Sequence, residues 1–443
     1  MNLNYIGSRF NKKRIINNLI SKISQTSSSV LVQLIFPPLM IIFYGLENFG
    51  IWVFLSALPL IFSTFNINLF EASKNEMSIY HNQNKIKKVQ EIFNNSKFFT
   101  LILFLILALA GIIFLKFFDY DLKILEEINK KDAKILIFCF FFSYYLTVIK
   151  GIFEIGIIFW GKLYIQVYIE TFFDFFIKFS ILVVGFFEGD LVTAAYIYLF
   201  LNIIKFLAYL FFFMKYKKYL SILSFKFINY KILKKILLIS VPHFFENISN
   251  LIKSSFQIII LGLFFSSSVI GLISTLKTMF YYMPSRFWGI PIHISYYEIA
   301  KLFSKNQINT LKIFISNLIK LNLIISFVLF LIIFFFGLNF YNFWLNNSYE
   351  INRIFILILL FEVITFNFST TFKLFNKSIN DFFSISIFDF VINITILLLL
   401  FILFNHGVKY EIFFIINLSG SILICLFNYF IFFKSIKFYK KNI

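Results

Sequence analysis

Apolar runs of membrane-spanning length recur along the whole chain, and the clearest of them lies between Phe43 and Glu76. A short polar break at 44–48 is followed by an apolar run from Phe49 to Phe70, and charged residues resume at Glu71. A run of about 20 apolar residues is long enough to cross a bilayer as an α-helix. Because the break is too short to hold a domain, the preceding apolar run must turn straight back. The stretch therefore predicts an antiparallel pair of membrane helices.

Composition extends this conclusion to the rest of the chain. Of 443 residues, 14% are charged and 60% are hydrophobic, whereas about a quarter of the residues in a soluble protein are charged. Hydrophobic run length predicts twelve spans, at 19–43, 49–70, 98–118, 134–155, 163–187, 192–214, 236–264, 268–292, 313–337, 353–375, 382–404 and 411–433. The sequence thus predicts an all-α integral membrane protein with about twelve transmembrane helices.

Lysine and arginine side chains set the expected orientation of these helices. They gather in alternate loops, at 9–14, 85–88, 215–235, 301–305 and 434–441. Because positively charged loops stay in the cytoplasm, both termini and the 215–235 connection are expected there. The formal charge of +20 then reflects helix orientation and contact with anionic membrane lipid, and we expect no nucleic acid partner.

Internal similarity predicts a duplication. The segment around Gly50 matches the segment around Gly271 at an offset of 221, and Asn84 matches Asn306 at an offset of 222. Six spans in each half, both starting in the cytoplasm, indicate parallel repeats. We therefore expect an N-terminal six-helix bundle at 1–218, a cytoplasmic linker at 219–235 and a C-terminal six-helix bundle at 236–443, arranged around a central cavity.

Ionisable residues inside the spans are the candidate functional residues, because each costs about 2.5–3.5 kcal/mol to insert. Lys205, Lys253 and Lys277 each lie a third of the way or more into a span, which favours a cationic, water-filled cleft. Clustered basic side chains donate to several oxygens at once and suit a diphosphate. The predicted substrate-binding cations are Lys205, Lys253, Lys277, Arg286, Lys22 and Lys178.

Two interpretations of the buried charges stay open. Glu170, Asp174 and Lys178 follow each other at a spacing of four, which places them on one helix face, and Glu246 shares a face with Lys253. These sets either take part in function or neutralise each other and position helices. For Lys22, Lys150 and Lys320, the alternative is that the side chains extend to the cytoplasmic surface.

Enzyme motifs are absent from the sequence. The four histidines lack metal-ligand spacing, and no HExxH motif, phosphate-binding glycine loop or nucleophile elbow occurs. Cys139 and Cys425 both lie in apolar runs, so we expect neither a disulfide nor a metal site. We therefore expect no catalytic residue and no cofactor, and we interpret the chain as a transporter rather than an enzyme.

Three segments resemble a known family. They are Tyr44–Trp52 between the first two spans, Ile239–Pro242 with 261–264 and 268–272 in the second half, and Ala300–Asn306 after the eighth span. They are similar to polysaccharide-biosynthesis flippases (Wzx, RfbX-like), which serve O-antigen and lipopolysaccharide synthesis within the multidrug/oligosaccharidyl-lipid/polysaccharide (MOP) exporter superfamily. Asn66 and Gln257 stand where relatives often carry an aspartate, and Asn68 stands where they often carry a glycine.

This resemblance implies a flippase of the bacterial inner membrane. The substrate would be an undecaprenyl-diphosphate-linked oligosaccharide, moved from the cytoplasmic to the periplasmic leaflet, and the partners would be membrane lipids and other proteins of polysaccharide assembly. Glu170, Asp174 and Glu246 would then be the candidates for coupling to protons or another cation. The alternatives are a drug/cation antiporter of the MATE type and, less favoured, a membrane enzyme of glycan assembly.

Overall fold

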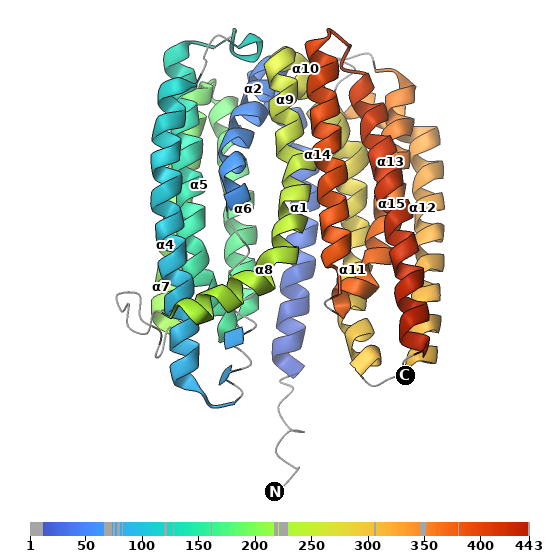
Figure 1. The fold of residues 1–443 in the computed structure, drawn as a ribbon. Coiled ribbons are helices and arrows are strands. Elements are labelled where there is room, and N and C mark those ends of the chain that lie inside the picture. The colour runs from blue at the N-terminus through green and yellow to red at the C-terminus, as the bar shows by residue number, and fades with distance from the viewer. Residues whose placement is uncertain are drawn as a thin grey trace, which may run out of the picture. The chain divides into compact units, whose positions relative to one another are not determined.

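The computed structural model consists of α-helices and short 3-10 and π turns, without strands in the part of the chain it describes (Figure 1). The described residues are 12–65, 73, 76–77, 80–81, 83–118, 122–126, 128–160, 162–216, 220, 229–304, 307–345, 351–379 and 381–441. The chain divides into two compact units of similar size. Each unit is described separately below.

Unit 1 comprises 1–45, 58–121 and 125–241. Its helices are α1 (Lys12–Tyr44), η2 (Leu58–Phe65), α4 (Ile86–Phe117), α5 (Lys130–Phe159), α6 (Leu163–Phe186), α7 (Leu191–Tyr216) and the first part of α8 (Tyr230–Leu251). Helix α5 packs against α4 and α7, and α6 packs against α1 and α7. Asn95 on α4 accepts a hydrogen bond from the backbone nitrogen of Asn229 at 2.9 Å, which fixes the start of α8.

Unit 2 comprises 46–57, 122–124 and 242–443. In chain order, its helices are α2 (Leu46–Ala57), the rest of α8, η4 (Ile252–Phe256), α9 (Gln257–Phe264), α10 (Ser267–Lys277), η5 (Thr278–Tyr282), α11 (Met283–Ser304), α12 (Ile308–Trp344), α13 (Arg353–Ser378), α14 (Phe383–Asn405) and α15 (Ile412–Lys441). Helix α13 packs against α11, α12 and α15, and α14 packs against α15.

The helices agree with the expected spans. Each of the twelve apolar runs coincides with a helix or with a series of consecutive helical segments, such as α8–η4–α9 and α10–η5–α11. Among the described residues, nine helices are long and apolar enough to cross a membrane by themselves. Helix α6 is not among these nine because Glu170, Asp174 and Lys178 interrupt its apolar surface. The all-helical, twelve-span architecture agrees with the sequence prediction.

The repeat motif found in the sequence forms a reciprocal contact inside unit 2. A Cβ atom on Gly50 of α2 would overlap the backbone oxygen of Ser267 on α10, and a Cβ on Gly271 of α10 would lie 2.8 Å from the backbone oxygen of Leu46 on α2. The repeat exchanges the two contacts, because Gly50 corresponds to Gly271 (271 − 50 = 221) and Leu46 corresponds to Ser267 (267 − 46 = 221). The matching segments thus cross at backbone distance, which only glycine permits here.

This crossing explains why α2 belongs to unit 2, although it lies in the sequence range expected for the N-terminal bundle. Of the expected linker at 219–235, residues 219 and 221–228 lie outside the described residues, and α8 already begins at Tyr230. The central cavity between the bundles stays a prediction.

Candidate functional site: buried charge clusters

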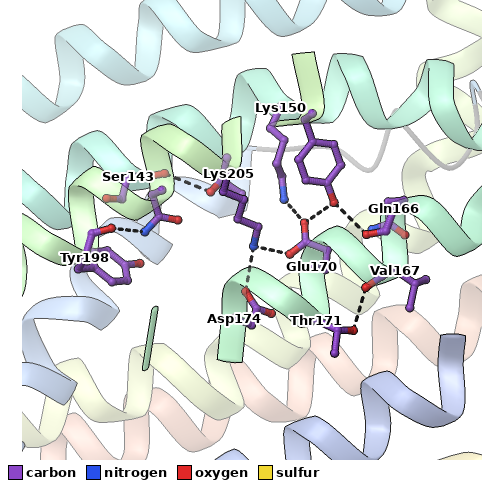
Figure 2. Close-up of polar contacts among 12 residues, drawn as sticks. Ser143, Lys150, Gln166, Val167, Glu170, Thr171, Asp174, Tyr198 and Lys205 are labelled. Carbon is purple, nitrogen blue, oxygen red and sulfur yellow. Dashed lines mark hydrogen bonds and ion pairs between the residues drawn. The ribbon is translucent and has the colours of Figure 1, made fainter. Parts of the chain in front are cut away.

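The first cluster of buried charges lies in unit 1, where α5, α6 and α7 meet, and it is called the Glu170 cluster here. Glu170 on α6 is paired with Lys150 on α5 through Oε1 and with Lys205 on α7 through Oε2 (Figure 2). Tyr209 on α7 donates its hydroxyl to Glu170 Oε1 at 2.7 Å. Both oxygens of this carboxylate are therefore held by cations from neighbouring helices.

Two further carboxylates complete the Glu170 cluster. Lys205 Nζ lies 2.9 Å from Asp174 Oδ1, and Lys150 Nζ lies 3.0 Å from Glu154 Oε1. Both lysines are buried, whereas the Asp174 side chain is 58% exposed. The cluster thus holds two ammonium groups and three carboxylates, a formal excess of one negative charge. Such buried pairs need good geometry and additional hydrogen bonds to offset desolvation.

The second cluster lies in unit 2 between α8, α13 and α14, and it is called the Glu246 cluster. Glu246 on α8 pairs with Lys373 at 3.2 Å and with Lys377 at 2.9 Å, both on α13. Lys373 also donates to Asp389 Oδ2 on α14 at 3.0 Å. His243 Nδ1 lies 3.9 Å from Glu246 Oε2. The two ammonium groups and two carboxylates are formally balanced.

The third cluster, also in unit 2, is called the Lys277 centre. Lys253 pairs with Glu362 on α13 at 3.1 Å and donates to Ser421 Oγ on α15 at 2.9 Å. Lys277, only 3% exposed, donates to the backbone oxygen of Lys253 at 3.2 Å and to Gln257 Oε1 at 3.3 Å. These two acceptors are neutral, so Glu362 is the one carboxylate described for this centre. With two ammonium groups and one carboxylate, the centre has a formal excess of one positive charge.

Aromatic rings complete the surroundings of both lysines. Lys253 Nζ lies 4.8 Å from the ring centroid of Tyr281, and Lys277 Nζ lies 5.1 Å from that of Phe413 and 5.7 Å from that of Tyr282. Cation–π attraction of this kind contributes more when the charge is desolvated. The rings stabilise the excess positive charge of the centre without neutralising it.

Both lysines of this centre lie at π turns. Lys253 is inside η4, and Lys277 directly precedes η5, which contributes Tyr281. A π turn inserts an extra residue into a helix and frequently occurs at functional sites. The two irregular turns aim side chains of consecutive helices at one charged centre.

Three predicted cations are not among the ion pairs described above. Lys22 on α1 is exposed and donates to Gln25 Oε1 at 2.8 Å. Lys178 on α6 lies 5.9 Å from the ring centroid of Phe36 on α1, and Arg286 on α11 is exposed. The structure therefore brings together Lys253 and Lys277 among the six predicted cations, and Lys205 joins Glu170 and Asp174.

Two sequence interpretations are corrected by these contacts. Glu246 and Lys253 do not neutralise each other along one helix, because Glu246 pairs with α13 and Lys253 pairs with Glu362. Lys150 does not extend to the surface, because it is buried between Glu154 and Glu170. Both corrections have one reason: helices packed side by side offer closer counter-charges than a helix offers itself.

Sequence reasoning also misses two members of the Glu246 cluster. Lys373 and Lys377 lie near the expected end of the tenth span and are not among the candidate residues. The internal repeat could have identified Lys373, because it corresponds to Lys150 at an offset of 223. This offset differs by only two residues from the offset of 221 found for the glycine motif.

Metal ligands do not gather in the part of the chain that the structure describes. No group of three or more histidine, cysteine, aspartate or glutamate side chains there is arranged to hold a metal ion. Cys139 and Cys425 are free thiols.

Comparison with solved structures identifies the fold. An inward-facing multidrug resistance MATE family transporter of the MOP superfamily superimposes with a TM-score of 0.61 at 15% identity, covering 93% of this chain and 99% of that one. A MATE protein in the bent conformation gives 0.59 at 14% identity, covering 97% and 96%. A MOP superfamily transporter from Pyrococcus furiosus, described by a reverse polarity of its binding pocket, gives 0.59 at 13% identity, covering 97% and 96%.

Searches by sequence add nothing to this result, since no family model and no curated protein matches the chain. At these identities the superpositions establish the fold alone. The chain has the fold of the MATE transporters of the MOP superfamily.

Proposed function

We propose that this protein is a membrane transporter that moves a lipid-linked, anionic glycan, of the undecaprenyl-diphosphate type, across the cytoplasmic membrane. The observation that carries the proposal is the Lys277 centre, where Lys253 pairs with the one carboxylate and the buried Lys277 has only neutral acceptors among the described residues. A buried excess cation attracts an anionic group and repels an organic cation. The aromatic and amide side chains around it suit the remainder of a sugar-bearing head group.

Two further observations support the proposal: the fold and the segments that resemble flippases. The MOP superfamily fold belongs to solved transporters, and the segments at Tyr44–Trp52 and Ala300–Asn306 resemble flippases of that superfamily. Lys277 is buried in this conformation, so a head group reaches it only after the helices around η4 and η5 have moved apart. The lipid tail would stay in the bilayer.

A second candidate function is the export of organic cations, as in a multidrug transporter. The Glu170 cluster favours it, because this cluster carries a formal excess of one carboxylate. The two candidates differ in which cluster meets the substrate. The sign of the charge on the transported substrate distinguishes the two candidate functions.

The test is a transport assay in proteoliposomes that contain the full chain. A short-chain polyprenyl-diphosphate oligosaccharide with a fluorescent label is placed in one leaflet, and its translocation is followed by quenching. We expect Lys277→Gln to slow translocation at least about tenfold, because the charge-assisted bond to the diphosphate is lost. Lys320→Gln is the matched control, since Lys320 is an exposed lysine on α12.

Transport of ethidium by the same vesicles tests the second candidate. Translocation of the lipid-linked glycan that is equal in wild type and Lys277→Gln would contradict the proposed role of the centre. Ethidium transport without glycan transport would favour the second candidate.

A further inference from the structure

Gln257 belongs to the Lys277 centre, and the side chains around it form a hydrogen-bonded chain. Lys277 Nζ donates to Gln257 Oε1 at 3.3 Å, and Gln257 Nε2 donates to Asn417 Oδ1 at 2.6 Å. Asn417 Nδ2 in turn donates to the backbone oxygen of Phe413 at 2.8 Å. Both amide side chains are buried. The chain of hydrogen bonds therefore joins α10, α9 and α15 inside unit 2.

The two ends of this chain fix the orientation of both amide groups. A backbone carbonyl can only accept a hydrogen bond, and an ammonium group can only donate one. Asn417 must therefore direct its nitrogen to Phe413 and its oxygen to Gln257, which leaves the Gln257 oxygen for the ammonium group. A flip of either amide would place two donors or two acceptors face to face. Gln257 is thus held as an acceptor for Lys277.

The π turn before Gln257 supplies the second acceptor of Lys277. The backbone nitrogen of Gln257 donates to the backbone oxygen of Ile252, five residues earlier. In a regular α-helix it would donate to Lys253, four residues earlier. The Lys253 oxygen instead accepts from Lys277 Nζ at 3.2 Å. Both described acceptors of the Lys277 ammonium group thus come from one turn of the chain, and both are neutral.

A neutral acceptor satisfies a buried ammonium group without cancelling its charge. Glutamate has nearly the size and shape of glutamine, and a glutamate at this position would pair with Lys277 as Glu362 pairs with Lys253 at 3.1 Å. The centre would then hold two ammonium groups and two carboxylates. The neutral amide of Gln257 therefore leaves the centre its formal excess of one positive charge.

We propose that Gln257 sets the charge selectivity of the Lys277 centre. Held in one orientation by Asn417, it orients the ammonium group of Lys277 and leaves the positive charge available to an anionic group of the substrate. This inference rests on the proposed function for the identity of the substrate. The sign of charge that the centre accepts is measured separately from transport.

The test is the binding of inorganic pyrophosphate to the full chain in lipid nanodiscs, measured by calorimetry. We expect Gln257→Glu to weaken binding at least about tenfold, because the new carboxylate neutralises Lys277. Gln257→Met removes both side-chain hydrogen bonds but adds no charge, so it should weaken binding less. A purely structural role predicts the reverse order, because Gln257→Glu retains the bond to Lys277. Binding that Gln257→Met weakens as much as Gln257→Glu would therefore overturn the proposal.

The matched control is Gln307→Glu, which makes the same substitution at an exposed position before α12. This variant adds the same charge to the chain outside the Lys277 centre. It should bind pyrophosphate as tightly as wild type. A loss equal to that of Gln257→Glu would show that the effect belongs to net charge and would overturn the proposal.

A second background decides the question even where Gln257→Glu alone does not fold. Glu362→Gln removes the carboxylate beside Lys253, and adding Gln257→Glu restores the charge count of wild type. Pyrophosphate binding should weaken at least about tenfold from Glu362→Gln to the double variant. The double variant should bind close to wild type. Equal binding by Glu362→Gln and the double variant would contradict the role of Gln257.

Failure of this inference and failure of the proposed function give different results. Wild type that binds pyrophosphate without translocating the lipid-linked glycan contradicts the proposed function, and loss of that binding in Gln257→Glu still supports the role of Gln257. Wild type that translocates the glycan, with Gln257→Glu binding pyrophosphate equally well, overturns the role of Gln257 alone. Wild type that binds ethidium and no pyrophosphate overturns both.

Discussion

The Glu170 cluster and the Glu246 cluster share one repeat-equivalent lysine, Lys150 in unit 1 and Lys373 in unit 2, but the other charges around this lysine differ. Unit 1 surrounds its central carboxylate with two lysines, Lys150 and Lys205. Unit 2 has Lys373 as the first lysine, and the neutral Asn428 stands at the position that corresponds to Lys205, since 205 + 223 = 428. The two halves thus share a lysine–carboxylate pair, while the charge at the second position differs.

The difference shows how two similar bundles acquire different charges. The Glu170 cluster carries a formal excess of one negative charge, and the Glu246 cluster is balanced. Unit 2 instead carries its excess positive charge at the Lys277 centre, on the irregular helices α8–η4–α9 and α10–η5–α11. The Glu170 cluster and the Lys277 centre thus carry formal excess charges of opposite sign.

The largest effect is expected from breaking the closed network of unit 1. Lys205→Met leaves Glu170 and Asp174 without a shared cation, and removal of one partner from a buried pair costs about 3–5 kcal/mol. Unfolding in mixed micelles should therefore show a large loss of unfolding free energy. Lys320→Met, at an exposed position, should stay within about 0.5 kcal/mol of wild type.

This experiment sharpens the comparison when Asn428→Leu is measured beside it. Asn428→Leu removes the hydrogen bond from the Asn428 amide to Ser369, whereas Lys205→Met leaves two carboxylates without their shared cation, so Lys205→Met should cost more unfolding free energy. Equal losses for the two variants would contradict this comparison.

An intermediate effect is expected from the glycine crossing that the two halves share. Gly50→Ala forces a Cβ into the backbone oxygen of Ser267, and Gly271→Ala brings one within 2.8 Å of the backbone oxygen of Leu46. Backbone atoms cannot rotate away, so each change should cost about 1–3 kcal/mol in unfolding free energy.

The crossing has a matched control in α11. A Cβ on Gly289 meets no described atom within 4 Å, so Gly289→Ala should stabilise the helix by about 0.5–1 kcal/mol. A reciprocal contact also predicts similar losses for Gly50→Ala and Gly271→Ala. If either glycine tolerates alanine as well as Gly289 does, the crossing is looser than the structure indicates.

The smallest effect concerns the starts of the last helices of each half. Asp190 Oδ1 accepts a hydrogen bond from the backbone nitrogen of Thr193 at 2.8 Å and so caps α7. Glu411, related to Asp190 by the offset of 221, precedes α15, and there the backbone oxygen takes Phe414 N at 3.2 Å. Asp190→Ala should cost about 1 kcal/mol, and Glu411→Ala should cost less.

This cap also predicts a dependence on pH. The hydrogen bonds from Thr193 hold the pKa of Asp190 below its ordinary value. A carboxyl group with a lowered folded pKa stabilises the fold above its unfolded pKa, and this stability is lost as the pH falls through the folded pKa. The difference in melting temperature between wild type and Asp190→Ala should therefore shrink on acidification. Asp190→Asn retains the cap without the charge and should show no such change.

Much of the fold followed from local properties of the sequence. The twelve spans and the glycine motif were predicted because apolar run length and short repeats are read along the chain. The structure shows why both copies of the motif contain a glycine, because Gly50 and Gly271 lie where α2 and α10 cross at backbone distance. The substrate, the coupling ion and the central cavity stay predictions.

The candidate site was predicted less completely, and the reason is visible in its ion pairs. The sequence identified Glu170, Asp174 and Glu246 as buried acids, but their partners Lys205, Lys150 and Lys373 come from neighbouring helices. Spacing along one helix indicates which side chains share a face. It does not indicate which face a neighbouring helix presents.

The sequence by itself determined that this chain crosses a membrane many times, that its halves match and that its spans carry unusual charge, because hydropathy and repetition are properties of the chain. The tertiary structure decided which charges cancel and which remain. Helix packing alone brings Lys253 to Glu362, leaves Lys277 among neutral partners and brings Lys373 to Asp389. Electrostatic energy depends on distances of a few ångströms between helices, and these distances exist only in the folded protein.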